Sequence, residues 1–301
     1  MDAGARREER RSRRVVRQMD RVAARASRRA RRRAWRRSHG PLLGLAGVVV
    51  VLGLCAGMLA FSGISAADIL RPRAYVEIDG RAVRVPEPEP ADGRLLPAVP
   101  VTTQGAYAFL HTSDDGAPIG YDPCRPVTYV VRPDGMPEGG QALLDEAAAI
   151  VGSASGLVLE YAGETDEAPA VERALIQPER YGDRWAPVLV AWADETAMPE
   201  LAGDVVGVGG SAAVPGAHGE GQWLAAGRVV LDVPDLAGML ARPGGHEQAR
   251  ALVVHELAHV LGLDHVDDPT ELMFPVNATR TDLGPGDLAG LALVGQVACQ
   301  D

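Results

Sequence analysis

The longest uninterrupted apolar stretch of the chain lies near its N-terminus. From Gly40 to Ala67 no residue is charged, and the run LLGLAGVVVVLGLCAGMLAF over residues 42–61 is twenty residues long. An α-helix rises about 1.5 Å per residue, so this run would extend roughly 30 Å, the hydrocarbon thickness of a bilayer. The pattern therefore predicts a transmembrane helix within residues 40–67.

The charge on the two sides of this stretch predicts its orientation. Residues 1–39 hold sixteen of the thirty basic residues against four acids, a balance of +12, while the remainder carries −22. Because Arg-rich flanks stay in the cytoplasm, we expect residues 1–39 to form a basic cytoplasmic tail against anionic lipid, with the folded part outside the cell. Trp35 is the only aromatic residue among these charges, so nucleic-acid binding is not expected. Small residues at 65–67 leave a cleaved signal peptide and a secreted protein as the alternative.

Beyond the apolar stretch, the spacing of apolar residues changes from element to element. Residues 68–105 include EPEPADGRLLPAVP, which favours a stiff Pro-rich linker, and residues 106–301 are predicted to be the folded domain. The glycine-rich run VVGVGGSAAV over 205–214 fits either an edge strand or a loop. The order of the remaining elements indicates an α+β fold. Strands are predicted over residues 106–110, 126–133, 157–163, 187–194 and 227–234, and helices over residues 140–154, 246–262 and 285–296.

The last long helix carries a cluster of histidines. His255 and His259 are four residues apart, so they lie on one helical face and can hold one zinc ion, with Glu256 beside it. Gly262 can end the helix in the left-handed conformation, after which the chain can turn back and present His265 as a third ligand. A catalytic zinc has three protein ligands and one open position. An ordinary core helix would need all five residues at these spacings by accident.

The whole run HELAHVLGLDHVDDPTELMFP, with Met273 eight residues after the last histidine, resembles the metzincin metallopeptidases. It is most similar to their matrixin branch, in which an aromatic residue and a proline follow the methionine. The resemblance implies a mixed, twisted sheet, a long active-site helix and a C-terminal helix. It also implies one catalytic Zn²⁺ held by His255, His259 and His265, Glu256 as the catalytic base, and Met273 as a structural floor beneath the metal.

The same resemblance implies a monomeric zinc endopeptidase that hydrolyses protein or peptide substrates. A zinc-binding surface module that tethers or senses a partner without turnover is the rival interpretation. Asp264 is either a partner that orients an imidazole or a solvent-exposed acid, and His218 and His246 are expected at the surface. Structural Ca²⁺ sites stay open, because the calcium loops of animal matrixins have no clear counterpart.

Cysteines distinguish this chain from secreted matrixins. Those proteins are kept latent by a propeptide cysteine, but residues 71–122 contain none. Cys55 lies in the apolar stretch, which leaves Cys124 and Cys299 as a possible disulfide. In an oxidising compartment that bond would contribute a few kcal/mol in the chain-entropy model. Two free thiols are the alternative.

Overall fold

The computed structural model of this protein describes residues 72–78, 80–276 and 280–300, together with eight isolated positions. The chain divides into two compact units, residues 1–71 and 72–301. No helix among the described residues is long and apolar enough to cross a membrane. The basic tail and nearly all of the predicted transmembrane helix at 40–67 lie outside those residues, so the anchor, its orientation and its lipid contacts stay predictions. The isolated positions are Arg28, Arg29, Val48, Val50, Val51, Gly53, Leu54 and Gly57.

A five-stranded mixed sheet organises the folded unit. Its strand order is β5-β4-β6-β8-β7, and the first four strands are parallel to one another. All six residues of β6 are buried, as expected for a continuous apolar strand in a parallel sheet. Only β7 runs antiparallel, and it forms one edge. The strands span Leu159–Glu164 (β5), Val127–Val131 (β4), Val188–Ala193 (β6), Gln222–Asp232 (β8) and Gly207–Pro215 (β7).

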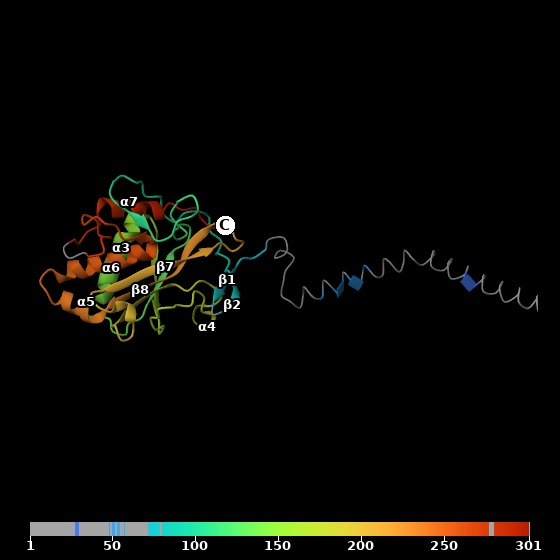
Figure 1. Ribbon diagram of the computed structural model, residues 1–301, viewed down its shortest axis with the longest axis horizontal. Helices are drawn as coiled ribbons and strands as arrows, with labels where there is room; N and C mark the ends of the chain where they lie inside the picture. Colours follow the sequence, from blue (N-terminus) through green and yellow to red (C-terminus); the bar gives the residue numbers. More distant parts are fainter. Residues whose placement is uncertain are drawn as a thin grey trace, which may run out of the picture. The chain divides into compact units, whose positions relative to one another are not determined.

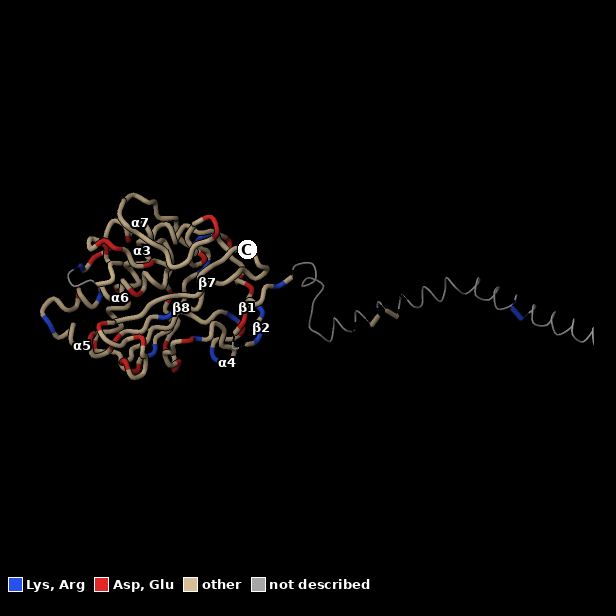
Figure 2. Tube along the Cα trace, viewed as in Figure 1, with Lys and Arg blue, Asp and Glu red and all other residues tan. Residues whose placement is uncertain are grey.

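Three long helices pack together, and one of them lies directly on the antiparallel edge of the sheet. Figure 1 shows α3, α6 and α7 grouped together, with α6 next to β7 and β8. The predicted helical face of α3 is buried against this core and includes Leu143, Leu144, Ala147 and Val151. Acidic positions outnumber arginines in this unit (Figure 2), in keeping with the negative balance beyond residue 39. The helices span Gly140–Ser155 (α3), Gly245–Leu261 (α6) and Pro285–Val294 (α7).

Most of the predicted elements exist, so the α+β fold with a mixed sheet is confirmed. The stretch at 205–214 forms β7, which makes it an edge strand and not a loop. Two helices were not predicted: α4 (Pro178–Tyr181) and α5 (Val233–Leu240). Proline occupies the first turn of both, and the Asp232 side chain caps α5 by accepting the N–H of Asp235. These start signals were present in the sequence.

The region predicted as a stiff Pro-rich linker, residues 68–105, contains regular structure in its described part. Two strands, β1 (Tyr75–Ile78) and β2 (Arg81–Arg84), form an antiparallel hairpin. Further along, the Thr103 hydroxyl donates to the Pro285 carbonyl, and the Gln296 side chain donates to the carbonyl of Val99. Alternating residues around an Asp-Gly pair are a hairpin signal, and the many prolines obscured it. Residues 72–105 therefore lie against the domain instead of extending away from it.

A disulfide joins the segment before β4 to the C-terminal end of the domain. Cys124 and Cys299 are bonded, with their Cα atoms 5.5 Å apart. They are separated by 175 residues in sequence, and closing a loop of that length contributes about 5 kcal/mol in the chain-entropy model. The pairing that the sequence allowed is thus present in the structure.

Candidate metal centre

The C-terminal end of α6 brings the three histidines together. Gly262 caps α6 with φ of 114°, and its N–H bonds to the carbonyls of Ala258 and His259. This left-handed residue ends the helix at the position that the sequence predicted. The next two residues form β9 (Leu263–Asp264), which pairs antiparallel with β3 (Ala108–Phe109). That pairing turns the chain back and places His265 beside the helix.

The imidazole rings of His255, His259 and His265 converge through one nitrogen each. Every pair of their Nε2 atoms is 3.1 Å apart. His255 Nδ1 bonds to the Leu272 carbonyl and His259 Nδ1 to the Leu263 carbonyl, both at 2.8 Å. Because a carbonyl can only accept, these Nδ1 atoms carry the protons and their Nε2 atoms present lone pairs.

A bound cation would remove the repulsion between these nitrogens. Lone pairs that face one another at 3.1 Å repel unless a proton or a metal ion lies between them. Tetrahedral zinc with Zn–N bonds of about 2.05 Å separates its ligand nitrogens by about 3.3 Å, close to the spacing seen. Within the described residues, this trio is the histidine cluster able to hold a metal ion, and it fits zinc.

Burial keeps the three histidines in the form that binds metal. It lowers the pKa of His255 to about 3, with the charge on neighbouring His259 as a smaller cause. Burial also lowers the pKa values of His259 and His265. Neutral imidazoles therefore persist at physiological pH, and no proton has to leave before a cation binds.

Glu256 lies between the helix and the edge strand. Its side chain is buried, and this burial raises its pKa to about 8, while a hydrogen bond from the Gly209 backbone opposes the rise. A cation held by the neighbouring imidazoles would favour the charged form of the carboxylate. A carboxyl group whose pKa lies near neutrality is suited to exchange protons with a reacting group.

Two glycines of β7 make room for Glu256, and the sequence analysis missed their role. A Cβ on Gly209 would lie 2.3 Å from the Glu256 carbonyl oxygen, and one on Gly207 would lie 2.9 Å from the Glu256 Cγ. Gly210, by contrast, has no atom within 4 Å of a Cβ position. The alternating Gly-x-Gly pattern in a strand was the available signal, since it marks close backbone approach.

The turn after the motif is buried and holds one of the three histidines through a backbone carbonyl. Met273 is 1% exposed, and Leu272, whose carbonyl holds His255, is part of the same turn. The buried Asp287 carboxylate of α7 accepts the N–H groups of Leu272 and Met273. Glu271 in return accepts the N–H groups at the start of α7, from Gly286 and Asp287. These two acids were also missed, because only the fold brings residues 271 and 287 together.

The other two candidate histidines lie apart from this trio, whereas Asp264 lies beside it. His246 Nε2 contacts the Glu146 carboxylate on the exposed side of α6, and the backbone of His218 bonds to Glu220. Asp264 accepts the backbone N–H of His265 at 2.7 Å. It therefore stabilises the turn that presents His265 through the backbone of that residue.

A cleft of about 610 Å³ opens over the trio. Its walls are the three histidines and Glu256 on one side, residues Val206–Gly209 of the β7 region on another, and Phe274 and Pro275 after the methionine turn. The free edge of a sheet thus borders the groups able to hold a metal ion. An extended chain entering the cleft would meet both at once.

Comparison with known proteins agrees with this geometry. The family model of the matrixins matches residues 207–292, which run from the first residue of β7 into α7 and include every residue of the centre. No curated protein matches the chain. The match covers less than a third of the sequence, and the preceding sheet strands lie outside it. It supports a matrixin-like metallopeptidase, a zinc-dependent hydrolase that acts on proteins or peptides.

Proposed function

We propose that this protein is a zinc-dependent endopeptidase whose catalytic base is Glu256. The observation that carries the proposal is the convergence of three imidazole Nε2 atoms at 3.1 Å, beside a buried glutamate and a free sheet edge. A structural zinc site is closed by four protein ligands, but the described residues offer three here. An open fourth position is the arrangement that hydrolysis needs.

Different residues of the chain have different roles in the proposed reaction. When bound, zinc acts as a Lewis acid that acidifies water and polarises a carbonyl group. The Glu256 carboxylate takes a proton from the attacking water and passes it to the leaving nitrogen. His255, His259 and His265 hold the ion, and the carbonyls of Leu272 and Leu263 fix two of the ring orientations.

The outer edge of β7 is suited to hold the substrate. Asp232 N donates to the Val206 carbonyl, so residues 206, 208 and 210 direct their backbone groups toward β8. By alternation, Gly207, Gly209 and Ser211 direct theirs away from the sheet. An extended peptide can add there as a further strand, with its scissile bond above Glu256.

The sequence supports a location outside the cytoplasm for this activity. The apolar stretch at 40–67 and its Arg-rich flank support a single-pass anchor with the domain outside the cell membrane, and secretion after cleavage is the other possibility. The Cys124–Cys299 disulfide favours an oxidising compartment in both cases. Substrates would be proteins or peptides outside the cytoplasm.

The test compares two glutamates of the same helix. In the full-length, zinc-loaded protein, Glu256→Gln should keep one equivalent of zinc and lose at least about 100-fold in kcat on a peptide library, because only the base is removed. Glu247→Gln, an exposed residue in the first turn of α6, is the matched control and should keep both.

The rival interpretations give different results in the same experiment. A zinc-binding surface module would contain one zinc ion and cleave no peptide, even as the wild type. A protein that binds no metal would contain no zinc, even after dialysis against a zinc-containing buffer. Wild-type turnover in Glu256→Gln would contradict the assigned base.

A further inference from the structure

The outer edge of β7 is open at Gly207 but occupied at Ser211. His111 Nε2 lies 3.1 Å from the Ser211 carbonyl oxygen. A carbonyl only accepts, so the imidazole donates, and it fills the position that the N–H of an added strand would take. The backbone groups of Ser211 are the third outward-facing set along this edge, after those of Gly207 and Gly209.

His111 is held in place by the residues on both sides of it. The N–H of Leu110 donates to the Gly262 carbonyl, and the N–H of Ile119 donates to the carbonyl of His111 itself. The preceding β3 pairs with β9 beside the metal centre. Leu110 also lines the cleft. The imidazole is therefore anchored to the same elements that position His265.

Ser211 is fixed from its other side as well. Its hydroxyl donates to the Val260 carbonyl at 2.8 Å, so the Tyr121 hydroxyl, also at 2.8 Å, is the donor to Ser211 Oγ. Burial raises the pKa of Tyr121 to about 12, which keeps this donor protonated. Val260 directly follows His259 in α6. The position of Ser211 relative to the metal centre is thus set by side-chain and backbone bonds together.

The neighbouring strand carries an irregularity at the same place. The pairing of β7 with β8 shifts register opposite Ser211, and Ala226 there has φ of 52°, a left-handed value unusual for alanine. The buried guanidinium of Arg173 donates to the carbonyls of Ala226 and Gly227. A bulge bends and twists a pair of strands locally, and this one lies where the free edge of β7 ends.

We infer that His111 ends the peptide-binding edge at Ser211 and so limits how far a substrate can pair on one side of the scissile bond. The inference rests on the proposed function and specifies its substrates. Glu256 lies against β7 at Gly207 and Gly209, so cleavage occurs about two to four residues from the blocked position. With antiparallel addition, the commoner arrangement, the blocked side holds the residues N-terminal to the scissile bond. About two to four of them can pair, and substrates need only a short stretch before the cut.

The experiment uses the full-length, zinc-loaded protein and peptides lengthened one residue at a time on either side of a mapped cut. For the wild type, kcat/KM should stop rising after about two to four residues on the N-terminal side, within twofold, and should keep rising with C-terminal extension. In His111→Ala, the ratio of kcat/KM between long and short N-terminal extensions should increase about 2- to 10-fold, because a strand hydrogen bond becomes available.

His111→Gln is the matched control, because its side-chain amide can still donate to the Ser211 carbonyl. It should retain the wild-type plateau, and thermal unfolding of all three proteins shows whether the fold is kept. The wild-type length series tests the inference even if a variant does not fold. The inference would be overturned if the wild-type kcat/KM rose with every added N-terminal residue, or if it reached a plateau on the C-terminal side only. It would also be overturned if His111→Gln behaved like His111→Ala. Absence of any peptide cleavage would instead overturn the proposed function.

Discussion

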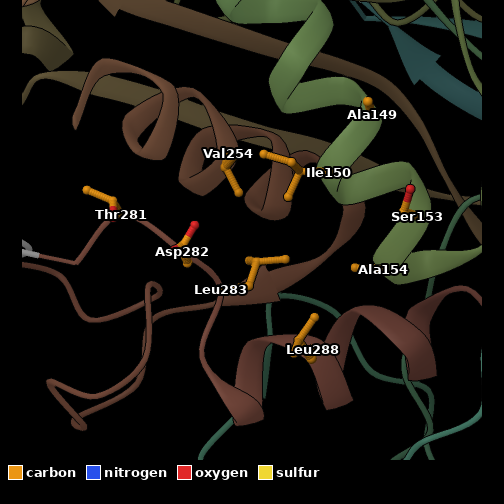
Figure 3. A pocket seen from close by; sticks show the side chains of 9 residues that line it. All are labelled: Ala149, Ile150, Ser153, Ala154, Val254, Thr281, Asp282, Leu283 and Leu288. Carbon is orange, nitrogen blue, oxygen red and sulfur yellow. The ribbon is translucent and has the colours of Figure 1, made fainter. Parts of the chain in front are cut away.

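Two cavities of nearly equal size lie on different faces of α6, and only one of them carries chemistry. The cleft over the histidines measures about 610 Å³, and a hollow between α3, α6 and α7 measures about 600 Å³. Figure 3 shows the second hollow, where Ile150, Val254, Leu283 and Leu288 direct apolar side chains inward and Asp282 is the only charged residue of its lining. Volume alone does not identify a functional site in this protein.

The difference arises from adjacent residues of one helix. Val254 faces the hollow, while His255, one residue later and 100° further around α6, faces the cleft. The hollow is lined mainly by side chains whose contacts are nonspecific. The cleft gathers three imidazole nitrogens that point at one another and a buried carboxyl group whose hydrogen bond comes from the Gly209 backbone. Groups that converge without a mutual partner are therefore the better mark of a site.

The largest effect is expected for the loss of a histidine in the cleft, and a substitution in the hollow should not reproduce it. His259→Ala removes one of three ligands, so zinc content should fall from one equivalent to near zero and hydrolysis by more than about 100-fold. Metal analysis after dialysis and a peptide assay measure both. Leu283→Ala in the hollow is the comparison variant. It should cost about 1–2 kcal/mol of unfolding free energy, since Leu283 is only half-buried, and leave zinc bound. A His259→Ala protein that still holds one zinc ion would contradict the assigned ligand set.

A smaller effect should distinguish two glycines that are neighbours in β7. Gly209→Ala places a methyl group against the backbone of α6 and should cost about 1–3 kcal/mol by overpacking. Gly210→Ala meets no atom within 4 Å and should change the unfolding free energy by less than about 0.5 kcal/mol. Urea unfolding of the zinc-free proteins measures the difference. Equal costs for the two variants would show that β7 does not rest on Glu256 as described.

Much of the site was predictable because its ligands follow a local rule. Helical spacing places His255 and His259 on one face, and the helix-ending Gly262 explains how His265 reaches them. The parallel strands were predictable for a similar reason, since buried strands such as β6 are continuous apolar runs. Each of these inferences needs only neighbours in sequence.

What the sequence did not predict depends on contacts between distant segments. Asp287 holds the methionine turn from fourteen residues away, and His111 reaches Ser211 across one hundred residues. The hairpin at 75–84 was read as part of a linker because the prolines that follow it, from Pro86 to Pro100, dominated the local composition. The run that holds Gly207 and Gly209 fitted an edge strand or a loop, and only the contact with α6 explains why glycine stands at these two positions. Such roles appear only when packing is known.

The last expected effect is a pH dependence of the metal-free protein that comes from a histidine of the cleft. Burial holds the folded pKa of His255 at about 3, below its ordinary 6.5, so the unfolded chain takes up the proton first as pH falls. The contribution is therefore complete above pH 6.5 and is lost progressively toward pH 3, with a slope of at most about 1.4 kcal/mol per pH unit. In chelator, urea unfolding from pH 7 to 4 should show this loss, and His255→Gln should show a shallower one. Leu283→Ala, which alters only the hollow, should keep the wild-type slope, and a parallel decline in all three proteins would place the titrating groups elsewhere.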